Sequence, residues 1–365
     1  MPNPSARGAP VLKAHQHVRE MQEYQVSPER PGIKLRLDLN ESTTGCSPRV
    51  LDKLNSMDAR TIALYTPREP GEKLVGDFLG LKKEQVLLTN GADEGIDLLC
   101  RAFLKPNDEV MVILPAFDMY QISAQVAGAK VIGVPAADDY AFPVGAVLQA
   151  INPRTRMVVI TNPNNPTGAV ASRADILKVL AAAPGAAVLL DEAYFDFYGQ
   201  TMMDQIGKIP NLFIVRTFSK AYGLAGLRLG ILAGAAEHMA ALRRICSPFN
   251  VNAFAIECLA EALADKQFVA DYVRQVVASR EWLQRELESL GFKCWPSQAN
   301  FVLVRFAEQR AAILAALEAR GIALRNRPDC AGCARITVGT QPEMEYVISE
   351  LKQVLSAKTS AQAAK

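Results

Sequence analysis

Polar side chains follow four short apolar runs of the sequence, at the point where each run ends. The runs at 86–89, 157–161, 186–190 and 212–215 lead respectively into Asn90–Glu94, Asn162–Gly168, Asp191–Tyr194 and Thr217–Lys220. In an open parallel sheet, ligands bind at the carboxyl ends of the strands. If the four runs are strands of one such sheet, an acid, amides, hydroxyls and a lysine converge there. The sequence therefore predicts a binding site along this edge.

Lys220 follows two residues with hydroxyl side chains, Thr217 and Ser219. It precedes a glycine-rich segment that contains Arg228. The glycines at 223, 226 and 230 allow the backbone to approach a ligand closely, and an arginine can pair with a phosphate. A lysine by itself is usually a solvated surface residue. In this segment, we instead expect a lysine that is held beside a bound anion.

Asp191 ends an apolar run, so its carboxylate is poorly hydrated and needs a partner. A protonated ring nitrogen is a suitable one, because a charge-assisted hydrogen bond holds the ring cationic. Pyridoxal phosphate needs such a partner, since its protonated pyridine is the electron sink of its chemistry. The alternatives are a helix N-cap and a metal ligand.

The segment Asn90–Glu94 joins a predicted strand to a predicted helix. The first backbone N–H groups of a helix have no partner within it and can bind a phosphate. Asp93 would repel that phosphate if it faced it, so we expect its side chain to cap the helix or turn aside. A purely structural junction is the alternative interpretation.

Composition limits the kinds of partner. The 365 residues carry a formal net charge of +2 and contain no block of five basic residues, which gives no reason to expect nucleic acid or membrane as a partner. No apolar run reaches the ~18 residues that span a bilayer, and the N-terminus does not resemble a signal peptide. An odd number of cysteines, seven, fits reduced thiols and predicts a cytoplasmic protein. We interpret Cys330 and Cys333 as loop cysteines rather than as a metal or redox site, because the three histidines are distant in the sequence.

The wider pattern predicts an α/β fold of two domains. Residues 1–37 form an arm whose start is partly disordered, residues 38–248 a large domain, residues 249–357 a smaller α+β domain, and residues 358–365 a frayed tail. Six apolar runs, the four above together with 109–114 and 130–134, are separated by helical patterns and predict a mostly parallel central sheet in the large domain. In the small domain we expect helices at 253–263, 268–290, 310–320 and 342–355 and strands at 300–304 and 334–338.

Three motifs together resemble the fold-type I pyridoxal-phosphate aminotransferases: Asn165-Pro166-Thr167-Gly168, Asp191-Glu192-Ala193-Tyr194, and Ser219-Lys220 with Arg228. The segments 91–95 and 224–228 are similar to the histidinol-phosphate aminotransferase branch, and the resemblance runs from about Tyr24 to Leu355. It implies pyridoxal 5'-phosphate as cofactor, L-histidinol phosphate and 2-oxoglutarate as substrates, and a role in histidine biosynthesis.

The same resemblance implies a role for each matching residue. Lys220 would form the internal aldimine and then move a proton between the substrate and the cofactor, Asp191 would pair with the ring nitrogen, and Asn165 and Tyr194 would bind the phenolate oxygen. The groups that would hold the cofactor phosphate are Ala92, Asp93, Thr217, Ser219 and Arg228. Phe117 would stack on the ring, unless it only packs in the core.

Five further residues match positions outside this cofactor set. Tyr65 resembles a tyrosine that reaches the partner subunit's cofactor, which implies a homodimer. Arg335 would bind the α-carboxylate of 2-oxoglutarate, unless it forms a salt bridge within the small domain. Tyr24 and Arg325 would contact the substrate phosphate, although tyrosine and arginine are also common on protein surfaces. Asn40 is expected at the mouth of the substrate site, where this chain has Asn40–Gly45 in place of Asn-Glu-Asn-Pro, which leaves the substrate preference open.

Other functions fit the sequence less well. An aminotransferase of aromatic amino acids, or an enzyme that resembles threonine-phosphate decarboxylase, would use the same scaffold. A regulator built on this fold would need a DNA-binding domain, and about 37 residues precede the body. A nicotinamide dehydrogenase should show Gly-x-Gly-x-x-Gly after an early strand, and the junction at Asn90 lacks that spacing.

Overall fold

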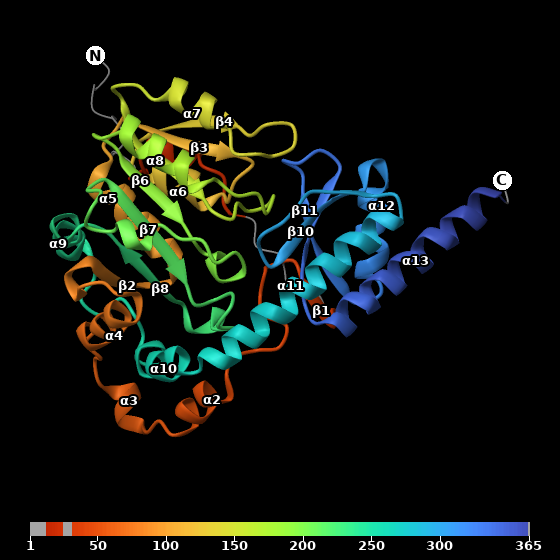
Figure 1. Ribbon diagram of the computed structural model, residues 1–365, viewed down its shortest axis with the longest axis horizontal. Helices are drawn as coiled ribbons and strands as arrows, with labels where there is room; N and C mark the ends of the chain where they lie inside the picture. The colour runs from red at the N-terminus through yellow and green to blue at the C-terminus, as the bar shows by residue number, and fades with distance from the viewer. Residues whose placement is uncertain (1–11, 25–30, 364–365) are drawn as a thin grey trace, which may run out of the picture.

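Two β-sheets organise the chain, and each forms the centre of one lobe of the computed structural model, which describes residues 12–24 and 31–363 (Figure 1). The larger sheet has the strand order β2-β8-β7-β6-β5-β3-β4. Its strands are β2 (Val86–Asn90), β3 (Glu109–Leu114), β4 (Lys130–Pro135), β5 (Thr155–Thr161), β6 (Ala187–Asp191), β7 (Leu212–Thr217) and β8 (Leu229–Ala233). Strand β8 runs antiparallel to β2 and β7, and the other neighbouring strands pair in parallel. The prediction of a mostly parallel sheet is therefore confirmed.

Helices cover both faces of the larger sheet. Consecutive strand residues point to opposite faces, so Leu189 packs in one core and Leu190 in the other. The core with Leu189 contains α5 (Gly91–Phe103), α6 (Met119–Val126) and α9 (Ala236–Ile245). The core with Leu190 contains α4 (Glu69–Leu79), α7 (Val144–Ala150), α8 (Arg173–Ala182) and α10 (Ala253–Ala264). Because β6 is buried on both faces along its length, it holds its carboxyl end rigidly.

The smaller sheet has the order β1-β11-β12-β10-β9. Its strands are β1 (Leu35–Leu37), β9 (Lys293–Cys294), β10 (Phe301–Arg305), β11 (Ile322–Arg327) and β12 (Cys333–Thr337). It packs against α11 (Lys266–Ser289), α12 (Arg310–Glu318) and α13 (Gln341–Ala363). Helix α11 runs from the base of the larger lobe to the smaller lobe, and α13 points away from the body (Figure 1).

The structure differs from the sequence-based expectation at several places. The arm contributes β1 to the smaller sheet, where Leu35–Leu37 pair in parallel with 322–324. Strand β8, directly after the glycine-rich segment, and strands β9 and β11 of the smaller sheet are absent from the expected elements. Helix α10 packs in the larger core, so we propose a domain boundary near Asp265 rather than at 248. Helix α13 continues to Ala363 instead of fraying after 355, since alanine, glutamine and lysine are good helix formers.

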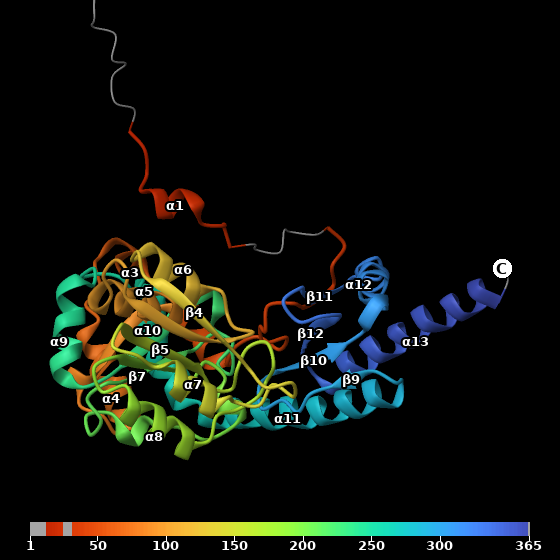
Figure 2. The ribbon, with the colours of Figure 1, turned by 90° about the horizontal axis from the view of Figure 1, so that it is seen from above.

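The remaining α-helices of the described residues are short: α1 (Gln16–Glu20), α2 (Pro48–Asn55) and α3 (Ala59–Ala63). Helix α1 lies outside both lobes on the side of α6 (Figure 2). Cys330 and Cys333 are buried in the turn between β11 and β12, beside Trp295 and Leu303. Within residues 12–24 and 31–363, no helix is both long and apolar enough to cross a membrane.

Candidate active site

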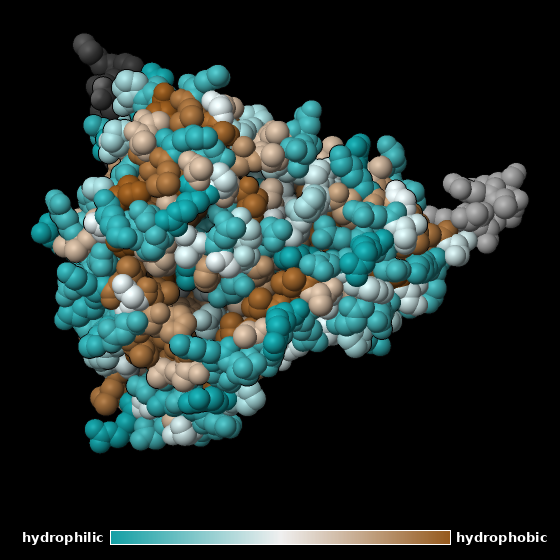
Figure 3. Space-filling view, viewed as in Figure 1, coloured by the Kyte–Doolittle hydropathy of each residue, from teal (hydrophilic) through white to brown (hydrophobic). Residues whose placement is uncertain are grey.

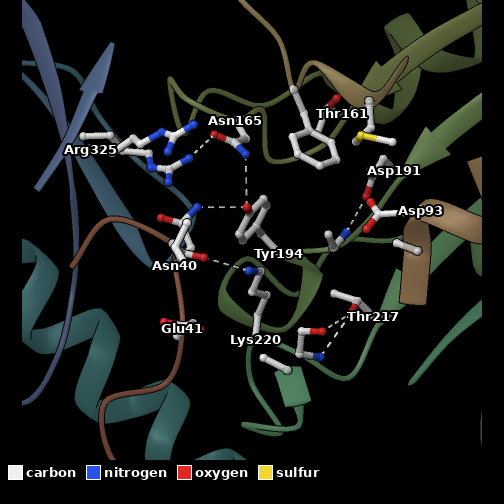
Figure 4. A pocket seen from close by; sticks show the side chains of 18 of the residues that line it. Asn40, Glu41, Asp93, Thr161, Asn165, Asp191, Tyr194, Thr217, Lys220 and Arg325 are labelled. Carbon is white, nitrogen blue, oxygen red and sulfur yellow. Dashed lines mark hydrogen bonds between the residues drawn. The ribbon is translucent and has the colours of Figure 1, made fainter. Parts of the chain in front are cut away.

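A cavity of about 480 Å³ lies where the carboxyl ends of β5, β6 and β7 face the smaller lobe (Figure 4). Fourteen of the fifteen residues expected at the site line it, from segments far apart in the sequence. They are Tyr24, Asn40, Ala92, Asp93, Phe117, Asn165, Asp191, Tyr194, Thr217, Ser219, Lys220, Arg228, Arg325 and Arg335. The structure therefore brings the predicted residues together around one space, and only Tyr65 lies elsewhere.

Lys220 follows β7 and directs its amine into the cavity (Figure 4). Its Nζ donates a 3.0 Å hydrogen bond to the backbone carbonyl of Leu39. Burial, with a smaller contribution from the Arg335 guanidinium, lowers the pKa of Lys220 to about 8, although Glu41 and Asp93 oppose this shift. A lysine with such a pKa has a sizeable neutral fraction near neutral pH and can act as a nucleophile.

Asp191 ends β6 and is almost fully buried. Its Oδ1 accepts the N–H of Ala193 at 2.9 Å, and its Oδ2 accepts the hydroxyl of Tyr120 at 2.5 Å. Burial raises the pKa of Asp191 to about 6, while these two hydrogen bonds lower it. The carboxylate is therefore mostly ionised at neutral pH and can hold a cationic ring nitrogen.

The hydroxyl of Tyr194 receives hydrogen bonds from two side-chain amides. Asn40 Nδ2 lies 2.9 Å from it and Asn165 Nδ2 lies 3.3 Å from it (Figure 4). Arg335 donates to Asn165 Oδ1 at 2.6 Å, which turns the NH₂ of Asn165 toward the tyrosine. Burial raises the pKa of Tyr194, and the Arg335 guanidinium and the Asn40 hydrogen bond oppose this. Burial is the larger effect, so the pKa of Tyr194 lies above its ordinary value and the phenol stays protonated at neutral pH.

Asn40 was expected to bind substrate, but its polar groups are engaged by the protein. Its side-chain Oδ1 and its backbone N–H both contact the hydroxyl of Thr337, at 3.2 and 3.0 Å, and its carbonyl accepts from Asn300 at 3.2 Å. The backbone of Asn40 is left-handed, with φ of 55°. We therefore propose that Asn40 holds Tyr194 rather than the substrate.

The start of α5 and the start of β8 form a cradle for an anion. Gly91 has φ of 77°, and a Cβ there would lie 2.5 Å from Nη2 of Arg228. A Cβ on Gly230 would lie 2.5 Å from the carbonyl carbon of Gly91. Both glycines are thus required for the close approach of these segments, which leaves the first N–H groups of α5 beside the Arg228 guanidinium.

The carboxylate of Asp93 forms a 3.1 Å ion pair with Arg228 and does not cap the helix. The side chain of Glu94 instead accepts the backbone N–H of Asn90, at 2.6 Å. On the other side of the cradle, the Thr217 hydroxyl donates to Ser219 Oγ at 2.9 Å. This arrangement of N–H groups, hydroxyls and a guanidinium suits a phosphate.

Arginines gather at the opposite end of the cavity. Arg325 and Arg335 are direct partners across the antiparallel pair β11 and β12, so their side chains lie on the same face. Arg335 is buried, and its Nη2 donates to the carbonyl of Asp38 at 2.6 Å. Burial lowers the pKa of Arg335 to about 10, which still leaves it charged at neutral pH. Two guanidinium groups on one face attract anions, so this end of the cavity is suited to anionic groups.

Aromatic rings border the same space. Phe117 is half-buried, and the ring of Tyr24 meets it edge-on with centroids 6.2 Å apart. Phe117 also meets Tyr120 edge-on at 5.7 Å. The arm residue Tyr24 therefore lies next to the ring that is expected to stack on the cofactor.

Two functional candidates were missed by sequence reasoning, Tyr120 and Arg327. Tyr120 comes three residues after Phe117, and Arg327 comes two residues after Arg325 on the same face of β11. Both line the cavity, and Arg327 Nη2 also donates to the carbonyl of Ala116 at 3.2 Å across the two lobes. The spacing from Phe117 and from Arg325 is the signal that could have identified them.

Tyr65 is 80% exposed and lies outside the cavity, with its ring stacked on Phe249 at 4.4 Å. Its neighbours Ile62 and Leu64 are also exposed. Figure 3 shows apolar side chains at the surface in this region, near α3 and α4 at the lower left. An apolar surface of this kind is typical of a protein–protein interface.

The residues around the cavity fit pyridoxal phosphate. A lysine with a lowered pKa, a buried ionised carboxylate and a doubly hydrogen-bonded tyrosine stand around one space. The cradle at Gly91 and Gly230, which a Cβ would fill, provides for a phosphate at the edge of that space. Each polar group of the cofactor thus has a candidate partner of suitable chemistry.

Comparison with known proteins agrees with this geometry. A family model described as aminotransferase class I and II matches residues 32–351. The chain is 33% identical to a histidinol-phosphate aminotransferase of Dehalococcoides mccartyi, covering 88% of this chain and 90% of that protein. It is 33% identical to the histidinol-phosphate aminotransferase of Caldanaerobacter subterraneus, covering 93% of this chain and 98% of that protein.

Solved structures share the fold. The histidinol-phosphate aminotransferase of Sinorhizobium meliloti, solved in complex with pyridoxal-5'-phosphate, superimposes with a TM-score of 0.85 at 24% identity. The superposition covers 96% of this chain and 99% of that one. The family match contains every expected site residue except Tyr24, which precedes residue 32.

Proposed function

This chain belongs to the family of class I and II aminotransferases, and we propose that it transfers the amino group of L-histidinol phosphate to 2-oxoglutarate. It is a pyridoxal-phosphate-dependent aminotransferase. The proposed products are imidazole acetol phosphate and L-glutamate, in histidine biosynthesis. The names of the relatives support this donor over phenylalanine, tyrosine or threonine phosphate, which a similar scaffold also accommodates.

When bound, the cofactor supplies a protonated ring that withdraws electrons from the substrate carbon as this carbon loses its proton. We assign the covalent attachment of the cofactor to Lys220 Nζ; once released from that bond as a free amine, the same nitrogen would take up the proton removed from the substrate carbon. Asp191 would keep the ring nitrogen protonated, and the hydroxyl of Tyr194 with the amide of Asn165 would bind the phenolate oxygen. The cradle formed by Ala92, Asp93, Thr217, Ser219 and Arg228 holds the phosphate.

The observation that carries the choice of substrates is the pairing of Arg325 with Arg335 across β11 and β12. Two guanidinium groups on one face of the sheet border the cavity and suit two anionic groups. A planar guanidinium binds a carboxylate or a phosphate through two parallel hydrogen bonds. We therefore propose that Arg335 binds the α-carboxylate of 2-oxoglutarate and Arg325 the phosphate of the donor, with Tyr24 of the arm covering that end.

A panel of amino donors tests this assignment. Histidinol phosphate, histidinol, phenylalanine, tyrosine and threonine phosphate are compared with the wild-type protein and with Arg325→Ala. We expect histidinol phosphate to be the preferred donor, and Arg325→Ala to reduce kcat/KM for it about 10- to 100-fold, as loss of a charged hydrogen bond implies. Histidinol, which has no phosphate, should be little affected by the substitution.

Arg305→Ala is the matched control for that panel, because it removes an exposed arginine of the same sheet outside the cavity. Equal turnover of phenylalanine and histidinol phosphate by the wild type contradicts the proposed donor. An equal loss for phosphorylated and unphosphorylated donors in Arg325→Ala contradicts the proposed site of the phosphate.

We also propose that the protein is a homodimer in which Tyr65 completes the partner's cofactor site. The exposed cluster of Leu51, Ile62, Leu64, Tyr65 and Phe249 supports this, because it would become buried between two copies. Tyr65 is 80% exposed and does not line the cavity of its own chain, so its hydroxyl can be offered to a second subunit.

A further inference from the structure

Tyr120 is a buried tyrosine in the first turn of α6, with 1% of its surface exposed. Its hydroxyl oxygen lies 2.5 Å from Oδ2 of Asp191 and 3.0 Å from the hydroxyl of Thr161. Thr161 and Asp191 end adjacent parallel strands and are direct partners in the register of β5 and β6. The hydroxyl is thus fixed between two strand ends and a helix.

The direction of these hydrogen bonds follows from chemistry. An ionised carboxylate oxygen can only accept a hydrogen bond, so Tyr120 donates to Asp191. The oxygen of Tyr120 then accepts the hydroxyl proton of Thr161. The order of donation is Thr161 to Tyr120 to Asp191, which points every proton of this chain of groups toward the carboxylate.

We propose that Tyr120 is a positioning residue that keeps Asp191 ionised and oriented toward the cofactor ring, with Thr161 supporting it. The inference rests on the proposed role of Asp191 and adds a residue that acts through it. The same side chain meets Phe117 edge-on at 5.7 Å, so one residue supports both the carboxylate and the ring expected to stack on the cofactor.

The electrostatic surroundings explain why Asp191 needs this support. Burial is the main cause that raises its pKa, and the neighbouring carboxylates of Asp93 and Glu192 raise it further. The hydrogen bonds from Tyr120 and from the N–H of Ala193 oppose these effects. Tyr194 also lies close enough to interact with both Tyr120 and Asp191. Removal of the Tyr120 hydroxyl should therefore raise the pKa of Asp191 from about 6 toward neutral pH.

The test measures cofactor binding rather than turnover. The full-length protein is loaded with pyridoxal phosphate, and cofactor release and equilibrium affinity are followed from pH 5.5 to 9 for wild type, Tyr120→Phe and Thr161→Val. We expect Tyr120→Phe to weaken affinity about 10- to 100-fold at pH 7, because a hydrogen bond to a charged group is lost. The deficit relative to wild type should shrink above pH 8, where Asp191 ionises in both proteins.

Thr161→Val should shift the binding profile in the same direction by about 2- to 10-fold, as expected for loss of a neutral hydrogen bond. It decides the question if Tyr120→Phe does not fold. The matched control is Tyr272→Phe, which removes the hydroxyl of another buried tyrosine, in α11 and outside the cavity. This control should bind the cofactor as wild type does at every pH.

Two outcomes overturn the proposal: an affinity of Tyr120→Phe within about twofold of the control, or a loss of the same size at every pH. Failure of the proposed donor leaves these results untouched, because no substrate is present. The Asp191→Asn variant tests whether Asp191 itself holds the cofactor. Wild-type affinity in that variant would show that it does not.

Discussion

The side-chain amide of Asn40 donates a 2.9 Å hydrogen bond to the hydroxyl of Tyr194, 154 positions later in the chain. The two residues before Asn40 make similar contacts, since the carbonyl of Leu39 accepts from Lys220 and that of Asp38 accepts from Arg335. Three consecutive residues between β1 and α2 thus contact three side chains to which we assign chemistry. This segment fixes the relative positions of the two lobes at the site.

Asn40→Ala should impair turnover without abolishing cofactor attachment. It removes one of the two amides that donate to Tyr194 and leaves a buried hydroxyl of Thr337 short of a partner, which costs about 1–3 kcal/mol. We expect kcat to fall about 10-fold and the pH midpoint of the cofactor's visible absorption to shift. Asn40→Gly is the control for backbone strain, because glycine adopts the positive φ freely; an unchanged absorption midpoint in both variants contradicts the assigned role.

Lys220 should react with the cofactor in its neutral form. Because its pKa is lowered to about 8, the reactive amine increases as pH rises through this value and then levels off. The rate of attachment to cofactor-free protein, followed by absorbance, should rise up to about pH 8 and then reach a plateau. Borohydride reduction followed by mass spectrometry should find the cofactor on wild type and none on Lys220→Ala or Lys220→Arg. A rate that still rises near pH 10, the ordinary range for lysine, would contradict the lowered pKa.

Gly91→Ala should weaken cofactor binding. The new Cβ would lie 2.5 Å from Nη2 of Arg228, and φ of 77° is unfavourable for alanine, so the guanidinium must move from the cradle. We expect the dissociation constant for pyridoxal phosphate to rise about 10-fold or more. Gly145→Ala is the matched control, because a Cβ there meets no atom within 4 Å. Equal affinity of the two variants would show that the cradle is not the phosphate site.

Arg335→Lys should raise the KM for 2-oxoglutarate more than it lowers kcat. A lysine keeps the charge but lacks the planar fork that binds a carboxylate in two bonds and also reaches Asn165 and Asp38. The expected rise in KM is about 10- to 100-fold, measured in steady-state kinetics at saturating donor. An unchanged KM with normal thermal stability would assign Arg335 a purely structural role.

The proposed dimer predicts complementation between two inactive variants. Tyr65→Ala lacks the residue offered to the partner, and Lys220→Ala lacks the attachment site. In a mixed dimer, one of the two sites recovers both residues, so mixing the variants under conditions of subunit exchange should restore up to about a quarter of wild-type activity. Light scattering of the wild type should give the mass of two chains. A monomeric mass, or activity that never returns on mixing, contradicts the shared site.

Much of the fold was predictable because it depends on local pattern. Apolar runs bounded by helical segments identified six strands of the larger sheet, and both C-terminal strands expected in the smaller lobe lie where the pattern placed them. The pattern did not identify β1, β8, β9 or β11, whose place in a sheet depends on pairing with other strands and not on local periodicity. Whether α10 belongs to the larger or the smaller domain likewise depends on the core against which it packs, which is that of the larger lobe.

The sequence by itself determined the chemistry of this protein. Lys220, Asp191, Tyr194 and Arg228 were identifiable because each stands in a short motif next to one end of a strand, and the resemblance to known aminotransferases assigned a role to each. Only the tertiary structure decided what surrounds them: Tyr120 on Asp191, Asn40 on Tyr194, and Arg325 opposite Arg335. These relationships arise from packing between elements that are distant along the chain. Local residue spacing does not determine which distant elements pack together. The motifs name the reacting groups, and the packing of the two lobes sets their ionisation and orientation.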